Sequence, residues 1–371
     1  MKVLIDLQGA QGFGAGRGIG RYSLELSRAM FELEKDELEL FFLINLSIKE
    51  NLDKTISYLR EFCPQKNIKG FFVPEAEDFR VNSWRQQAKL IRGIKIKEVN
   101  PDLILLTSLF EPIGSMVFSE FDALGCRQAV ILYDLIPYEN PETYLNNEKD
   151  AKNYERLIRQ LTRSDLILSI SGYTTNAFLK NFGKKSISPI VTIGAATSKK
   201  GPNGFLSQER NLNNLEKFKI IREYILTVSG QDKRKNLKTL LAAFSSLPRK
   251  VREKHQLVII CDIESSIINS LMNGFANNCQ LENEIIFTGS VTESELDLFY
   301  LNCKLFIFPS ISEGFGLPVL EAMTFGCPCI VANSSSLPDL VGDAAVKFNA
   351  IDSCDLGRKI LDLISDSSKL A

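Results

Sequence analysis

Two carboxylates stand close together in the stretch SEGFGLPVLEA, where the seven residues GFGLPVL separate Glu313 from Glu321. Apolar runs at 305–308 and 329–332 flank this stretch and predict two buried parallel strands. Pro318 predicts the start of a helix and Gly326 its end, because Pro suits the first helical position and Gly the position after the last turn. At such a helix N-terminus, unpaired N–H groups and the helix dipole attract an anion. Glu313 is therefore expected beside an anion site, and Glu321 one turn further into the helix.

Two cations stand at another predicted turn. Arg234 and Lys235 follow the apolar run 224–228, and a helix is expected to begin near Asn236. A diphosphate would lie at such a turn, and it gains negative charge when it departs as a leaving group. Cations held at this turn would stabilise that transition state more than the ground state. The alternative interpretation is that the run KRK is a solvated surface segment.

The pattern Glu-x7-Glu with GFGLP between the two carboxylates resembles the donor site of retaining glycosyltransferases of the GT-B fold, in particular glycosyltransferase family 4, or group 1. The resemblance implies that Glu313 meets the donor sugar and that Glu321 holds the ribose diol. It also implies that Arg234 and Lys235 are the basic pair of the family. The backbone is expected to contact the donor at two further places, the turn Gly314, Phe315, Gly316 and Leu317 and the nucleobase side at Ser290 and Val291. The alternatives are a loop charge for Glu313 and a solvated helix position for Glu321.

A glycine-rich run follows the first predicted strand, with glycines at 12, 14, 16, 18 and 20. The dinucleotide fingerprint G-x-G-x-x-G is not met at any start in this run, which argues against a nicotinamide enzyme. By resemblance, Gly18 and Gly20 face the interdomain cleft and the donor phosphates; a merely flexible loop is the alternative. The segments IDLQGAQ, RGIGRYS and YDLIP are most similar in sequence to bacterial O-antigen mannosyl- and rhamnosyltransferases.

Polar residues follow two more predicted strands, at 103–106 and 129–132. The carboxyl ends of parallel strands line the binding crevice of a doubly wound sheet, so Ser108, Glu111, Tyr133 and Asp134 are site candidates. Asp134 is expected to orient or deprotonate the acceptor hydroxyl, with a turn-capping Asp as the alternative. Many members of the family have His where this chain has Tyr133.

Composition excludes several kinds of site. The one histidine, His255, lies in the charged stretch RKVREKHQ and is expected to be exposed; the eight cysteines lack C-x-x-C spacing, and no two Asp stand at i and i+2. We therefore expect no metal site. The resemblance implies that there is no cofactor and that a nucleoside-diphosphate sugar is the co-substrate. A net charge of −1 gives no support to a nucleic-acid partner.

Localisation is expected to be cytoplasmic, because no apolar run approaches the roughly 18 to 20 residues of a membrane span and the N-terminus reads as a strand. The predicted helix 82–99 is basic, with Trp84, Lys89, Arg92, Lys95 and Lys97. It is a candidate for peripheral contact with anionic lipid of the inner membrane or with a lipid-linked acceptor. A solvated surface helix is the alternative.

The expected architecture is GT-B, two Rossmann-like parallel-sheet domains facing across a cleft. Residues 1–196 would form the acceptor-side domain, 197–217 a polar linker and 218–371 the nucleotide-sugar domain. Only 23 residues (371 − 348) follow Phe348. The enzymes that the chain resembles usually continue further. The second domain is therefore expected to be truncated, as part of a longer polypeptide with further domains, or to have an unusually short C-terminus.

The expected activity is that of a retaining, metal-independent hexosyltransferase. GDP-mannose is favoured as donor and a growing surface glycan such as O-antigen as acceptor, while dTDP-rhamnose and UDP-hexoses stay open. A non-catalytic nucleotide-sugar or glycan-binding module and a UDP-sugar epimerase are the alternatives.

Overall fold

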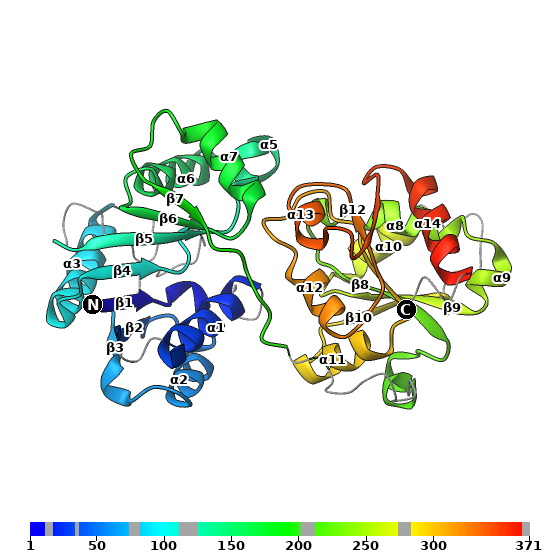
Figure 1. The fold of residues 1–371 in the computed structure, drawn as a ribbon, viewed down its shortest axis with the longest axis horizontal. Coiled ribbons are helices and arrows are strands. Elements are labelled where there is room, and N and C mark those ends of the chain that lie inside the picture. The colour runs from blue at the N-terminus through cyan, green and yellow to red at the C-terminus, as the bar shows by residue number, and fades with distance from the viewer. Residues whose placement is uncertain are drawn as a thin grey trace. The chain divides into compact units, whose positions relative to one another are not determined.

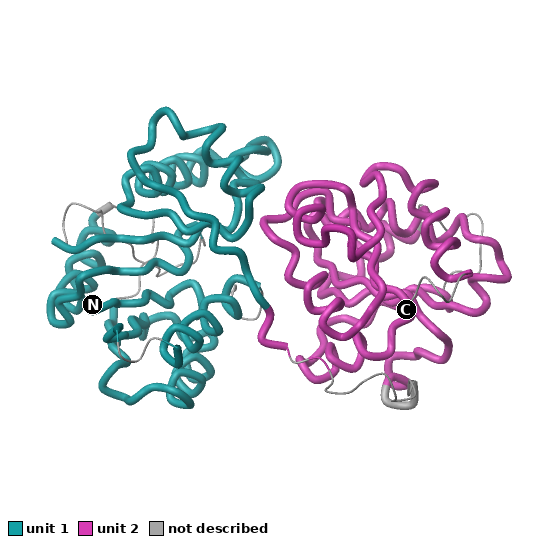
Figure 2. Tube along the Cα trace, viewed as in Figure 1, with its two compact units in different colours: residues 1–196 teal, residues 197–371 magenta. Residues whose placement is uncertain are grey.

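The chain divides into two compact units, Met1–Ala196 and Thr197–Ala371 (Figure 2). The computed structural model describes residues 1–11, 18–33, 37–73, 82–110, 125–199, 201, 212–273 and 283–365. The site candidate Glu111 and the glycines at 12, 14 and 16 lie outside these residues. Within the described part of the chain, no helix combines the length and the apolar character that crossing a bilayer requires.

Unit 1 is built on a seven-stranded sheet in the order β3-β2-β1-β4-β5-β6-β7, and every pair of neighbours is parallel (Figure 1). The strands are β1 Lys2–Asp6, β2 Glu39–Asn45, β3 Ile68–Phe71, β4 Leu103–Leu106, β5 Arg127–Leu132, β6 Leu166–Ser169 and β7 Ile190–Thr192. The α-helices are α1 Gly18–Leu33, α2 Leu52–Arg60, α3 Asn82–Val99, α4 Ile136–Glu139, α5 Pro141–Tyr144, α6 Glu148–Leu161 and α7 Gly172–Phe182, with 3-10 turns at Gln8–Ala10 and Gln65–Asn67.

Unit 2 contains a six-stranded parallel sheet in the order β10-β9-β8-β11-β12-β13. The strands are β8 Glu223–Val228, β9 His255–Ile260, β10 Ile285–Gly289, β11 Leu305–Phe308, β12 Cys329–Ala332 and β13 Val346–Phe348. The α-helices are α8 Leu237–Ser245, α9 Arg249–Arg252, α10 Ser265–Asn273, α11 Glu293–Asn302, α12 Leu317–Thr324, α13 Leu337–Val341 and α14 Ser353–Ser365, and the 3-10 helices are η4 Leu212–Phe218 and η5 Lys233–Lys235.

Both sheets follow the doubly wound pattern, in which strand order reverses beside the first strand of the sheet. The reversal lies between β1 and β4 in unit 1 and between β8 and β11 in unit 2. Apolar runs supply strands that are buried on both faces, as Leu305–Phe308 illustrates, because helices cover both sides of a parallel sheet. The expectation of two Rossmann-like parallel-sheet domains is therefore confirmed.

The predicted linker stretch 197–217 falls within unit 2. Its last part forms η4, and Leu215 in that helix is fully buried in the unit 2 core. Lys199 is ion-paired with Glu293, at 2.9 Å, and with Asp297, both on α11. Lys199 is thus held to unit 2 by ion pairs, and Leu215 is held by apolar packing.

His255 is the first residue of β9 and is only 4% exposed, so the expectation that it is exposed is wrong. Its Nδ1 lies 2.8 Å from the carbonyl oxygen of Val251. The charged neighbours gave the wrong expectation because they lie before the strand, in α9 and the turn after it, whereas His255 begins a strand whose six residues are all buried.

Candidate functional site

The predicted cations and the predicted loop carboxylate come together in unit 2. Arg234 and Lys235 lie in η5, which follows β8, and Glu313 lies in the loop that follows β11. Because β8 and β11 are parallel neighbours, their carboxyl ends meet at one edge of the sheet. This edge is also the point where strand order reverses, the place where doubly wound sheets bind ligands.

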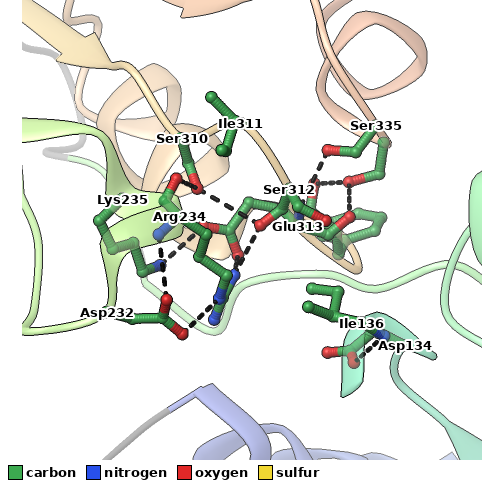
Figure 3. A network of polar contacts seen from close by, with 12 residues as sticks. Asp134, Ile136, Asp232, Arg234, Lys235, Ser310, Ile311, Ser312, Glu313 and Ser335 are labelled. Atoms are coloured by element: carbon green, nitrogen blue, oxygen red, sulfur yellow. Dashed lines mark hydrogen bonds and ion pairs between the residues drawn. The ribbon is translucent and has the colours of Figure 1, made fainter. Parts of the chain in front are cut away.

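Each oxygen of the Glu313 carboxylate accepts a bond from one cation (Figure 3). Arg234 Nη1 donates to Oε2 at 2.7 Å, and Lys235 Nζ donates to Oε1 at 2.7 Å. Hydrogen bonds between charged partners of this length are about twice as strong as neutral ones. We call Asp232, Arg234, Lys235 and Glu313 the charge cluster.

Arg234 is held from several directions. Asp232 Oδ2 accepts from its Nε at 3.0 Å, and Asp232 Oδ1 accepts from its backbone N–H at 3.0 Å. Its Nη1 also donates to the carbonyl oxygen of Ser312 at 2.7 Å. Lys235 Nζ lies 5.2 Å from the centre of the Phe308 ring, within the range of a cation–π contact. The cluster is therefore a built arrangement, and the solvated-surface interpretation of KRK does not describe Arg234 and Lys235.

Burial by itself would raise the pKa of Glu313, whose side chain is 8% exposed. The positive charges of Lys235 and Arg234 outweigh that effect, and the pKa lies below the usual value. Glu313 is thus held as a buried carboxylate that stays ionised.

Two serines that the sequence did not single out hold the Glu313 loop. The backbone N–H of Glu313 donates to Ser335 Oγ at 2.9 Å. Ser336 Oγ lies 2.9 Å from the carbonyl oxygens of both Glu313 and Phe315. Both serines belong to the polar loop after β12, and the run NSSS was its only sequence signal.

The predicted donor turn leads into α12. Gly314 is buried, and Gly316 precedes the helix with a φ of 112°, a conformation that favours glycine. A Cβ at Gly316 would lie 2.7 Å from Leu337 Cδ2. Leu317 begins the helix, followed by Pro318 at a first-turn position, close to the predicted start.

Glu321 lies within α12 and is 2% exposed, so the solvated-helix alternative is excluded. Tyr300, in the last turn of α11, donates its hydroxyl to Glu321 Oε2 at 3.1 Å. Ser290 and Val291 follow β10 directly and precede α11, and Ser290 is exposed. Glu321 and the charge cluster thus flank the turn that begins α12.

The remaining predicted residues belong to unit 1. Gly18 and Gly20 lie in the first turn of α1, and Ser108 is buried just beyond β4. Asp134 follows β5, and its Oδ1 accepts from the backbone N–H of Ile136 at 3.0 Å, the contact expected of a turn-capping Asp. All four residues belong to unit 1.

Tyr133 connects the end of β5 to α1. Its hydroxyl lies 3.2 Å from Ser23 Oγ, and its ring meets the Tyr22 ring edge-on with 5.8 Å between centres. In this chain Tyr133, the residue before Asp134, therefore packs against α1, the helix that contains Gly18 and Gly20.

The basic helix α3 differs from the prediction at Arg92. This side chain is 1% exposed and pairs with Asp6, the last residue of β1. Arg92 Nη2 donates to Asp6 Oδ2 at 2.7 Å, and Arg92 Nε donates to the same oxygen at 3.0 Å. A buried guanidinium cannot bind lipid, so Arg92 is removed from the predicted membrane-facing set. The exposed side of the helix carries Leu90 and Ile94 as well as Lys97.

Residues 208–371 match the family model described as glycosyl transferases group 1. The chain carries a glycosyltransferase group 1 domain. The match spans most of unit 2, including the charge cluster and Glu321, and it confirms the family that the Glu-x7-Glu motif indicated.

Curated relatives and solved structures agree with this assignment. The serotype-specific mannosyltransferase WbdA of Escherichia coli is 28% identical over 99% of this chain, which covers 44% of that protein. The O-antigen chain mannosyltransferase B of Escherichia coli is 27% identical over 95% of this chain and 88% of its own length. The chain thus spans less than half the length of the first of these relatives.

The fold comparison covers both units. The Anabaena protein Alr3699/HepE, solved in complex with UDP and glucose, matches 100% of this chain and 91% of its own with a TM-score of 0.68 at 16% identity. WaaG, a glycosyltransferase involved in lipopolysaccharide biosynthesis, matches 100% of this chain and 92% of its own with a TM-score of 0.68 at 12% identity. The fold is that of the GT-B glycosyltransferases.

Proposed function

We propose that this glycosyltransferase group 1 chain is a retaining hexosyltransferase that transfers mannose from GDP-mannose to a hydroxyl group of a growing bacterial surface glycan such as O-antigen. The observation that carries the proposal is the contact of Arg234 and Lys235 with Glu313 at the switch point of unit 2. A nucleotide sugar offers a diphosphate, which binds cations, next to sugar hydroxyls, which donate to a carboxylate.

The proposed step replaces one bond to the anomeric carbon by another on the same face of the sugar. The bond from that carbon to the β-phosphate oxygen breaks as the acceptor oxygen bonds to it. Arg234 and Lys235 stabilise the negative charge left on the diphosphate, so no metal ion is needed for that purpose. Glu313 holds sugar hydroxyls, and Glu321 holds the ribose diol.

We assign the acceptor side to unit 1. The acceptor hydroxyl loses its proton in the transfer, and Asp134 is our candidate to orient that hydroxyl or accept the proton. Gly18 and Gly20 are our candidates for close approach of backbone to the donor phosphates. The choice of mannose and of an O-antigen-like acceptor is supported by the relatives named as mannosyltransferases, which are 27–28% identical to this chain over the aligned residues.

A nucleotide panel tests the donor. Thermal unfolding of the purified chain is followed with GDP, UDP and dTDP, and we expect GDP to raise the midpoint most, because a ligand that binds only the folded state stabilises it. Stabilisation by UDP or dTDP but not by GDP would replace GDP-mannose by a UDP-hexose or dTDP-rhamnose.

Product analysis tests the reaction. The chain is incubated with GDP-mannose and a mannose-containing acceptor glycan, and the linkage is determined by NMR; we expect a new α-linked mannose, which preserves the anomeric configuration of the donor. A chain that binds nucleotide but neither transfers nor hydrolyses the sugar is a binding module, and the proposed activity would then be wrong.

A further inference from the structure

A tyrosine outside the charge cluster touches the buried carboxylate of α12. The Tyr300 hydroxyl donates to Glu321 Oε2 at 3.1 Å, and the bond crosses from α11 to α12. Tyr300 is fully buried and Glu321 is 2% exposed. A hydrogen bond to a charged group in such surroundings contributes more than one in water, because the local dielectric constant is low.

Packing fixes the direction of this hydroxyl. The Tyr300 ring stacks on Phe325 with 5.8 Å between centres and meets Phe306 edge-on at 5.7 Å. The carbonyl oxygen of Tyr300 accepts from Cys327 Sγ at 2.7 Å. Ring and backbone are both held, so the hydroxyl is presented to Glu321 in one orientation.

Helix α11 links this contact to the residues predicted beside the nucleobase. Ser290 and Val291 come directly before Thr292, which caps the helix in a capping box with Glu295. The ten residues of α11 span about 15 Å at 1.5 Å per residue. Ser290 and Val291 precede the first turn of this helix, and Tyr300 lies in its last turn. The helix therefore connects the segment predicted beside the nucleobase to the residue that contacts Glu321.

We propose that Tyr300 is a positioning residue for nucleotide recognition: its hydroxyl fixes the plane of the Glu321 carboxylate so that it accepts the vicinal hydroxyls of a ribose. The last torsion of a Glu side chain has a broad energy minimum, so a carboxylate that loses this bond is less well ordered before the ligand binds. The pair then favours ribonucleoside diphosphates over analogues that lack the hydroxyls. This inference rests on the part of the proposed function that places ribose at Glu321.

Tyr300→Phe removes the hydroxyl and keeps the ring. Dissociation constants of the full chain are measured by calorimetry for GDP and for 2′,3′-dideoxy-GDP. We expect the affinity for GDP to fall about fivefold to tenfold, the effect of one hydrogen bond, and the affinity for the dideoxy analogue to change less than about twofold.

Tyr224→Phe is the matched control. Tyr224 is also fully buried in unit 2, but its hydroxyl donates to the carbonyl oxygen of Phe299 at 2.8 Å rather than to a carboxylate. Its removal should leave both affinities unchanged. If Tyr300→Phe instead weakens both ligands equally, or neither, Tyr300 is a packing residue and the inference is wrong.

Glu321→Gln provides a second measurement that does not depend on the folding of Tyr300→Phe. In this variant we expect the ratio of the affinity for GDP to the affinity for 2′,3′-dideoxy-GDP to fall from its wild-type value towards one. An unchanged ratio would overturn the inference. A wild-type chain that binds neither GDP nor UDP would overturn the proposed function as well. A wild-type chain that binds GDP and its dideoxy analogue equally would overturn only the ribose contact and the role of Tyr300.

Discussion

Glu313 serves two purposes that oppose each other. It orients Arg234 and Lys235 through bonds of 2.7 Å, and it also neutralises charge that a diphosphate would use. The charge cluster contains the cations Arg234 and Lys235 and the anions Asp232 and Glu313, so its formal charges sum to zero (+2 − 2 = 0). The binding of a diphosphate and the positioning of the sugar therefore place different demands on this one carboxylate.

Replacement of Glu313 by Gln separates these two purposes. The amide keeps the shape of the side chain and removes one negative charge beside the two cations. We expect Glu313→Gln to bind GDP about threefold to tenfold more tightly, on the order of 1 kcal/mol, while transfer from GDP-mannose falls by at least about a hundredfold. Calorimetry with GDP and a product assay measure the two effects.

Glu223→Gln is the control for net charge. Glu223 is half-exposed and pairs with Lys304 at 3.1 Å in the same unit. Its replacement by Gln changes the net charge of the chain by the same amount as Glu313→Gln does. We expect GDP affinity and transfer to stay as in the wild type. Weaker GDP binding by Glu313→Gln would show that orientation of the cations matters more than the charge that Glu313 neutralises.

The ionisation of Glu313 makes stability depend on pH. Burial raises the pKa of this carboxyl, but Lys235 and Arg234 lower it more, so the folded chain holds it below the usual 4.5. A lowered pKa stabilises the folded state above the unfolded-state pKa, and this contribution is lost as the pH falls through the lowered value.

The advantage of the wild-type chain over Glu313→Gln should therefore be constant from about pH 7 to about pH 5 and should shrink below about pH 4.5. Thermal midpoints of both proteins across this range measure the difference. A difference that does not change with pH would show that Glu313 makes no ionised contribution to folding.

At the scale of elements, the turn between β11 and α12 depends on Gly316. Its φ of 112° disfavours any residue with a side chain, and an added Cβ would lie 2.7 Å from Leu337 Cδ2 and 3.1 Å from Leu340 Cδ2. Gly326, after the same helix, also has a positive φ, 70°, but no atom lies within 4 Å of its added Cβ. The two glycines thus separate backbone strain from crowding.

Gly316→Ala should destabilise the chain by about 2–3 kcal/mol, and Gly326→Ala by about 1 kcal/mol. The first value combines strain with a clash against the buried Leu337, and the second contains strain alone. Urea unfolding followed by circular dichroism measures both. Equal losses in the two variants would show that Leu337 and Leu340 move aside at little cost.

Sequence patterns predicted the elements that carry the site because each pattern is local. Arg234, Lys235 and Glu313 each lie in the short segment between an apolar run and the next predicted helix, so their place at the end of a strand could be inferred from the chain itself. Tyr300 and Ser336 could not be found this way, since their partners lie 21 and 23 positions away on other elements. Their contacts depend on how the elements pack, which no periodicity records.

In helix α3, by contrast, the sequence predicted a surface position for a residue that the structure buries. Its basic composition predicted a charged surface, but Arg92 turns inward to Asp6, 86 positions away along the chain. A buried guanidinium needs a paired carboxylate, and only the three-dimensional arrangement of β1 and α3 provides one. Composition therefore predicted that the helix is basic but not which of its cations reach solvent.

At the scale of the whole molecule, each unit has a sheet and a buried core of its own. The core of unit 2 gathers residues from all of its strands, among them Ile225, Ile330 and Phe348, and includes Leu215 of η4. Domain-sized parts with a separate core can fold alone. The charge cluster, Glu321 and Tyr300 all belong to this unit, whereas Asp134, Gly18 and Gly20 belong to unit 1.

Residues 197–371 expressed alone should therefore unfold in one cooperative thermal transition and should bind GDP. The affinity should be about threefold to tenfold below that of the whole chain, because the phosphate contacts proposed for Gly18 and Gly20 are absent. They should transfer no sugar, because the proposed acceptor residues are absent. Circular dichroism and calorimetry measure folding and binding, and the same fragment with Glu321→Gln is the control for specific nucleotide binding. A fragment that folds but does not bind GDP would show that unit 1 supplies an essential part of the donor site, since the residues of unit 2 would then be in place and still insufficient.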